Sequence, residues 1–114
     1  MRLPHADEAV VPLKKITEYL LNDSHPEGSG KAAFFRRYGF RVDMPEVLRA
    51  ALLRLAREID VRESRITFGL KYVGVGVLDC PNGRRARVMT VWMLRSGLPP
   101  PYFVTAYPVL TEIR

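Results

Sequence analysis

The spacing of apolar residues changes halfway along the chain. In the first half they recur every three or four positions, which is typical of helices that pack by one face. In the second half they occupy every second position, which is typical of strands. Helices followed by strands predict an α+β fold, with the N-terminal helices packed on one face of a curved antiparallel sheet.

Three helices are predicted. The first opens at Val11-Pro12, because proline is tolerated at the first helical position, and ends before residue 22. Its apolar stripe consists of Leu13, Ile16, Leu20 and Leu21. A short second helix is expected at 31–38, with Gly39 placed to cap it.

The third helix has the clearest pattern and spans 43–60. Asp43 can cap it, and Glu46, three residues further on, completes a capping box. Its apolar stripe consists of Val47, Leu48, Ala51, Leu52, Leu55 and Ile59. We expect this stripe to be buried on the sheet, which makes 43–60 the central packing helix.

Three strands are predicted in the second half. "ITFGLKYVGVGVLD" alternates, and "PNG" at 81–83 predicts a hairpin, because Asn-Gly tolerates the backbone of a tight turn. "RRARVMTVWML" is the return strand, with Arg85 and Arg87 on the face opposite Trp92. The last strand, "YFVTAYPVL", is expected to place three side chains on one face: Phe103, Thr105 and Tyr107.

Length and composition predict one globular domain over 1–114. The chain is 47% hydrophobic and 26% charged, so it can bury a core without disulfides or metals. Its single cysteine, Cys80, can form neither an internal disulfide nor a zinc site, and we interpret it as a small apolar residue near a turn. No metal and no cofactor is expected.

The sequence gives no sign of a membrane segment. It has no run of 18 apolar residues, and the N-terminal "MRLPHADEAVV" has acids and a proline where an export signal needs an apolar stretch. We therefore expect a cytoplasmic protein.

Positive charge is concentrated in the second half. The net charge is +6; residues 1–60 hold ten basic and nine acidic side chains, and residues 61–114 hold eight and three. Such an excess favours polyanions as partners, although many domains are mildly basic without a functional reason. Lys71, Arg85 and Arg87 are the candidate nucleic-acid-binding residues.

The segment "HPEGSGKAAFFRRYGF" at 25–40 contains the candidate site. It lacks the spacing of a nucleotide-binding phosphate loop, because that pattern needs glycine at position 25 and Ser or Thr at position 32. His25 lies in a loop, and histidine can exchange protons near neutral pH. Lys31 lies at a helix start, where a bound anion is favoured. The alternative is a polar loop with a solvated lysine.

Thr105 and Tyr107 supply hydroxyl donors beside the strand that carries Arg85 and Arg87. Hydroxyl and guanidinium groups on one sheet face suit a phosphodiester, whose oxygens need directional donors. Alternatively, these are ordinary strand residues and a solvated basic face.

Five segments together resemble an uncharacterised bacterial domain family: "LPHADEAVV", "KKITEYLLNDSHPEGSGKAAFF", "GLKY", "PNGRRARVMTVW" and "PYFVTAYP". This family occurs as short proteins and as the last domain of polymorphic or contact-dependent toxins. The resemblance covers roughly residues 3–108. The family is in turn similar to the barnase/EndoU/colicin/RelE group of small ribonucleases.

The resemblance implies a metal-independent endoribonuclease that cleaves RNA through attack of the ribose 2′-hydroxyl on the adjacent phosphate. His25 would act as base or acid, Lys31 would neutralise developing charge, and Thr105 and Tyr107 would hold the phosphate. The EndoU pattern uses two histidines, and the only other one is His5, in the N-terminal segment.

Two further interpretations remain open. The chain could be a non-catalytic module that binds nucleic acid or a small antitoxin-like or immunity-like protein. It could also share its fold with toxins and serve only as the interaction partner of a neighbouring small protein.

Overall fold

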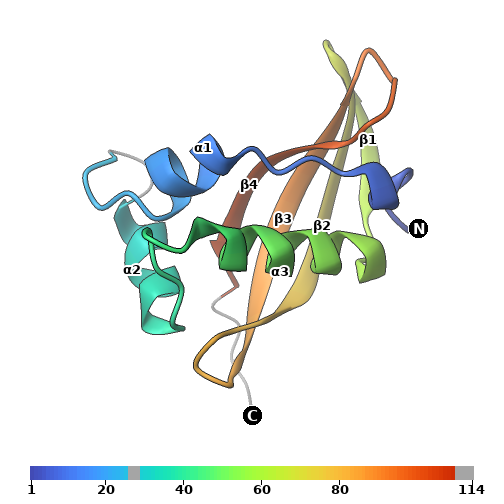
Figure 1. The fold of residues 1–114 in the computed structure, drawn as a ribbon. Helices are drawn as coiled ribbons and strands as arrows, with labels where there is room; N and C mark the ends of the chain where they lie inside the picture. The colour runs from blue at the N-terminus through green and yellow to red at the C-terminus, as the bar shows by residue number, and fades with distance from the viewer. Residues whose placement is uncertain (26–28, 110–114) are drawn as a thin grey trace.

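The computed structural model describes residues 1–25 and 29–109. Four strands form one antiparallel sheet in the order β1-β2-β3-β4. Their bounds are β1 Arg62–Ile66, β2 Gly69–Asp79, β3 Arg85–Arg95 and β4 Tyr102–Pro108. The helices lie together on one side of this twisted sheet (Figure 1), so the predicted α+β architecture is confirmed.

The helices precede the sheet in the chain, as expected. A short 3₁₀ turn at Ala6–Glu8 is followed by α1 (Leu13–Lys15), which continues into a π-helical turn, Ile16–Leu20. α2 (Ser29–Arg37) and α3 (Pro45–Glu58) complete the layer. α3 crosses the sheet, while α1 and α2 lie beside the β4 edge (Figure 1).

The core lies between α3 and one sheet face. The predicted alternation is confirmed in β2 and β3, where most inward residues are buried and Arg85 and Arg87 point to the opposite, outer face. Buried inward side chains of the sheet include Tyr72, Leu78, Val88, Trp92, Leu94 and Phe103. A Cβ at Gly76 would lie 2.9 Å from Leu55 Cγ, so this glycine lets α3 approach the sheet closely.

Three details of the helices differ from expectation. Met44, not Asp43, is the N-cap of α3 and makes no side-chain capping bond. Asp43 instead accepts two hydrogen bonds from Arg41, at 2.9 and 2.7 Å, and this ion pair removes its carboxylate from the helix end. Leu13 and Val47, predicted to be on buried stripes, are each 38% exposed.

Leu52 supports the role predicted for α3, since its side chain is fully buried. Leu52→Ala is expected to lower the free energy of unfolding by about 2–5 kcal/mol, through lost burial and the cavity left behind. Urea denaturation followed by circular dichroism measures the loss. Leu53→Ala, on the next, half-buried position, is the matched control and should cost less. A loss at Leu52 no greater than at Leu53 would contradict this packing.

Candidate functional site

Three side chains from separate elements meet at the edge of β4. The hydroxyl oxygens of Tyr19 and Thr105 lie 2.9 Å apart. Lys31 Nζ donates to Thr105 Oγ1 at 3.1 Å and also to the Tyr19 hydroxyl. The π-helical turn, α2 and β4 are therefore joined by one hydrogen-bonded group, which we call the Tyr19 cluster (Tyr19, Lys31 and Thr105).

His25 packs against this cluster. Its ring lies edge-on to the Tyr19 ring, with centroids 4.9 Å apart and planes at 72°. His25, Tyr19 and Thr105 line one pocket of about 400 Å³, together with Lys15 and Val104. Two residues predicted from the sequence, His25 and Thr105, thus line the same pocket. Lys31 is hydrogen-bonded to two of the residues that line it, Tyr19 and Thr105.

Two ammonium groups surround the Tyr19 ring. Lys31 Nζ lies 4.5 Å and Lys15 Nζ 5.6 Å from the ring centroid. Lys15 is held in place by donating to Val104 O of β4 at 2.9 Å. Among the residues that the structure describes, no carboxylate lines the pocket. The pocket is therefore suited to a negatively charged ligand.

The charges around Tyr19 change its acidity. Burial acts to raise the pKa of the phenol, but the hydrogen bonds of Lys31 and Thr105 and the charges of Lys31 and Lys15 outweigh burial, and the net pKa is lowered. The Tyr19 hydroxyl consequently gives up a proton more readily than an ordinary tyrosine. A group of this kind can serve in proton transfer.

A β-bulge in β4 gives Thr105 its orientation. Val91 of β3 pairs with Thr105 and the next residue, Trp92, pairs with Phe103, which leaves Val104 as the extra residue. The prediction that Phe103, Thr105 and Tyr107 share one face is therefore wrong. Phe103 is buried in the core, while Thr105 and Tyr107 both lie on the other face.

Tyr107 lies at the margin of the cluster. Its ring centroid is 5.8 Å from Lys31 Nζ, and the residue is 38% exposed. Tyr107 thus lies near Lys31, but among the described residues the two side chains form no direct hydrogen bond with each other.

Sequence reasoning missed Tyr19 and Lys15. The two residues are four positions apart, which places them on one helix face, beside the apolar stripe. The π-helical turn, in which Leu21 N donates to Ile16 O at 2.8 Å, buries Ile16 and Leu20. Such turns are frequent at functional sites, but apolar spacing does not reveal them.

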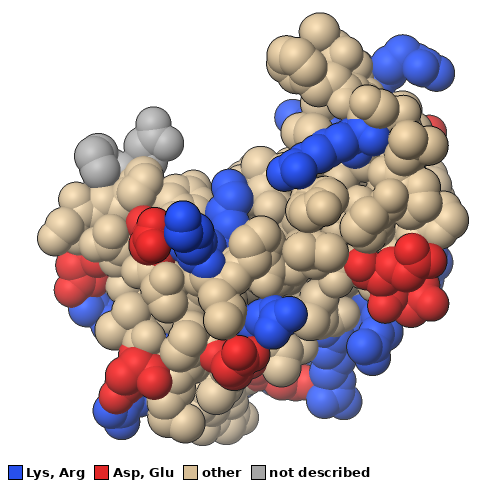
Figure 2. Space-filling view, turned by 45° about the horizontal axis from the view of Figure 1, so that its top comes forward, with Lys and Arg blue, Asp and Glu red and all other residues tan. Residues whose placement is uncertain are grey.

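The predicted nucleic-acid-binding residues lie on the outer face. Arg87 is exposed, Lys71 is half-buried, and Arg85 forms an ion pair with Asp79 at 3.3 Å. By strand register this is also the face of Thr105 and Tyr107. On the side of the molecule shown in Figure 2, basic side chains are interspersed with acidic ones.

His5 is not among the residues that line the pocket. It precedes the 3₁₀ turn, with Nδ1 3.8 Å from Glu8 Oε2. Within residues 1–25 and 29–109, no three His, Cys, Asp or Glu side chains are grouped so that they could hold a metal ion. None of the helices described is long and apolar enough to cross a membrane.

Comparisons with known proteins give a fold and a family. The fold is similar to a chain of the "Contact-dependent growth inhibition toxin - immunity protein complex from Klebsiella pneumoniae 342", with a TM-score of 0.67 and 16% identity. The match covers 93% of this chain and 97% of that one. A search of curated proteins gave no match. Residues 2–110 match the family model described as "Domain of unknown function (DUF6883)", and the chain belongs to this family.

Proposed function

We propose that this chain is a toxin-like, metal-independent endoribonuclease. The observation that carries the proposal is the Tyr19 cluster beside His25, in a pocket that no carboxylate of residues 1–25 and 29–109 lines. The fold likeness to a chain of a toxin–immunity complex adds support. RNA as substrate would place its action in the cytoplasm.

The proposed reaction is an internal transesterification. His25 takes the proton of the ribose 2′-hydroxyl while the 2′ oxygen forms a bond to phosphorus. The bond from phosphorus to the 5′ oxygen breaks, and that oxygen receives a proton from the Tyr19 hydroxyl. The products are a 2′,3′-cyclic phosphate and a 5′-hydroxyl. Tyr19 would thus take the part of the second histidine, which His5 does not supply.

Lys31 and Thr105 would stabilise the charged transition state. Lys31 Nζ lies 3.1 Å from Thr105 Oγ1, so both can contact one phosphate oxygen or two oxygens of the same phosphate. Donors placed in advance around developing negative charge are a main source of catalytic power. Tyr107, 5.8 Å from Lys31 Nζ by ring centroid, would hold the flanking nucleotide.

A small immunity-like protein partner belongs to the same proposal. The structural neighbour is a chain of a complex between a toxin and an immunity protein. The outer sheet face leaves Val75 and Val77 more than 40% exposed, which gives a partner an apolar surface. A binding module without catalysis would use the same face.

The purified chain is expected to cleave RNA in the presence of EDTA. Denaturing gel electrophoresis of a transcript incubated with and without added Mg²⁺ measures this activity. Fragments of equal yield under both conditions support the proposal. Activity that appears only with Mg²⁺, or an intact transcript under both conditions, would overturn it.

The outer face is expected to contribute electrostatically to RNA binding through Arg85 and Arg87. Replacing both by glutamine should weaken binding. It should also reduce the slope of the logarithm of the association constant against the logarithm of the salt concentration, by about 0.7 for each phosphate that is no longer neutralised. Fluorescence anisotropy at several salt concentrations measures the slope. The matched control replaces Arg54 and Arg57, exposed residues of α3, with the same change in net charge. Equal slopes for the two double variants would contradict a role of the outer face.

A further inference from the structure

The turn between β1 and β2 exposes an aromatic side chain. Phe68 is 75% exposed, although burying a phenylalanine would stabilise the fold by about 1.5–3 kcal/mol. Phe68 lines a pocket of about 820 Å³ at the end of the sheet, separate from the pocket of the Tyr19 cluster. Met93, Arg95 and Ser96 also line it.

The backbone of this turn is fixed in place. Ser96 N donates to Phe68 O at 2.8 Å, which ties the turn to the loop after β3. Gly69 has φ 144°, and a Cβ there would lie 2.1 Å from Leu94 O, so only glycine permits this close approach. Phe68 is thus presented on a rigid support.

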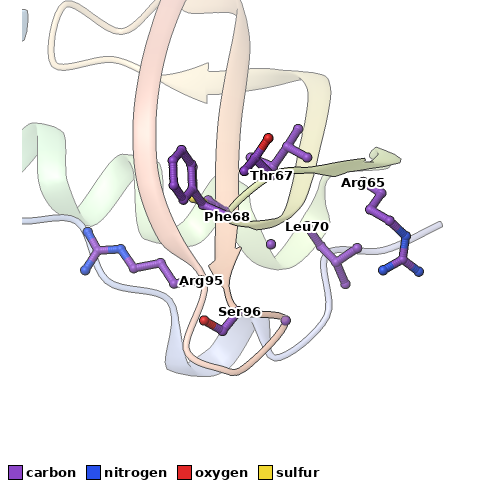
Figure 3. A pocket seen from close by; sticks show the side chains of 10 residues that line it. Arg65, Thr67, Phe68, Leu70, Arg95 and Ser96 are labelled. Carbon is purple, nitrogen blue, oxygen red and sulfur yellow. The ribbon is translucent and has the colours of Figure 1, made fainter.

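Strand register separates the two arginines at this end of the sheet. Arg95 pairs with Gly69 and lies on the outer face, whereas Arg65 pairs with Leu70 on the opposite face. Figure 3 shows Phe68 and Arg95 on one side, and Leu70 and Arg65 on the other. Phe68 therefore has Arg95 as its cationic neighbour.

Arg95 is held in position and retains its charge for a ligand. Its guanidinium carbon lies 4.0 Å from the centroid of the Tyr102 ring. Among the residues described, no carboxylate lines this pocket and no ion pair involves Arg95. The pocket combines an exposed aromatic ring with a positioned cation, which is the combination that binds single-stranded nucleic acid.

We propose that Phe68 stacks on an unpaired base of a single-stranded RNA while Arg95 binds an adjacent phosphate. This inference rests on the proposed ribonuclease function and specifies its substrate as unpaired RNA, because bases inside a duplex are stacked on their neighbours and leave no face free for Phe68. Arg95 and Val91, the cross-strand partner of Thr105, are four residues apart on β3, about 13 Å along the strand. A few nucleotides can span this distance to the Tyr19 cluster along the outer face.

The test is binding of a fluorescent single-stranded oligodeoxynucleotide at low salt, measured by anisotropy. Phe68→Ala is expected to weaken binding by about 5- to 150-fold, the loss of one stacked base. Leu98→Ala is the matched control, because Leu98 is 65% exposed in the neighbouring loop but does not line the pocket; affinity should be unchanged. Phe68→Trp should keep the affinity, and binding should quench the fluorescence of the introduced indole, since Trp92 is buried.

The outcomes separate the stacking site from the nuclease. The deoxy strand has no 2′-hydroxyl, so the measurement reports binding alone. Equal affinity of wild type and Phe68→Ala, absence of wild-type binding, or tighter binding of a blunt duplex would overturn the stacking site even if RNA is cleaved. The expected loss at Phe68, in a chain that leaves RNA intact, would support the stacking site and overturn the nuclease.

Discussion

His25→Ala is expected to lower the rate of RNA cleavage by about 10²–10⁴-fold, the usual contribution of a general acid or base. His25 is the histidine that lines the pocket beside Thr105, with its ring against Tyr19 at 4.9 Å. Removing the imidazole leaves the phosphate-binding donors in place, so RNA affinity should change little. Single-turnover cleavage of a labelled RNA, with affinity measured separately, distinguishes the two effects.

His5→Ala is the matched control for this experiment. It removes the other histidine, which lies beside Glu8 and does not line the pocket. Its cleavage rate should equal that of the wild type. Equal rates for His25→Ala and the wild type, with both proteins folded by circular dichroism, would remove His25 from the mechanism.

Lys31→Met is expected to lower the cleavage rate by about 10²–10³-fold, as loss of one transition-state donor does. Methionine keeps an unbranched chain but loses the ammonium group that donates to Tyr19 and Thr105. The same change removes the largest influence that lowers the pKa of Tyr19, so that pKa should rise. Cleavage rates measure the first effect, and ultraviolet titration of tyrosine the second.

Lys14→Met is the control for Lys31→Met, because Lys14 is exposed on α1 and its replacement causes the same change in net charge. It should leave both the rate and the tyrosine titration unchanged. A Lys31→Met variant as active as the Lys14→Met variant would show that the Tyr19 cluster is structural.

The fold could be predicted largely because the two sheet faces differ so clearly in β2 and β3. β1 was missed for the opposite reason: its sequence, Arg62–Ile66, has four exposed residues and one half-buried one, so no alternation marks it. As an edge strand it is defined by its pairing with β2, which is a long-range property.

Part of the candidate site could be predicted from the sequence. Residue type and position indicated His25, Lys31 and Thr105, and the structure brings the three together. Tyr19 was not predicted, because its contact with Thr105 depends on the π-helical turn and on the bulge at Val104. The spacing of apolar residues predicts neither of these irregularities. Local irregularities of this kind commonly orient functional side chains.

The most direct test of the proposed mechanism uses a DNA strand that contains a single ribonucleotide, incubated with the chain in EDTA. We predict cleavage only after the ribose, with a 2′,3′-cyclic phosphate on one product and a 5′-hydroxyl on the other, both identified by mass spectrometry. Replacing that ribonucleotide by its 2′-O-methyl form should abolish the reaction. Cleavage of the all-deoxy or 2′-O-methyl strand, or no cleavage at the ribose, would contradict the mechanism.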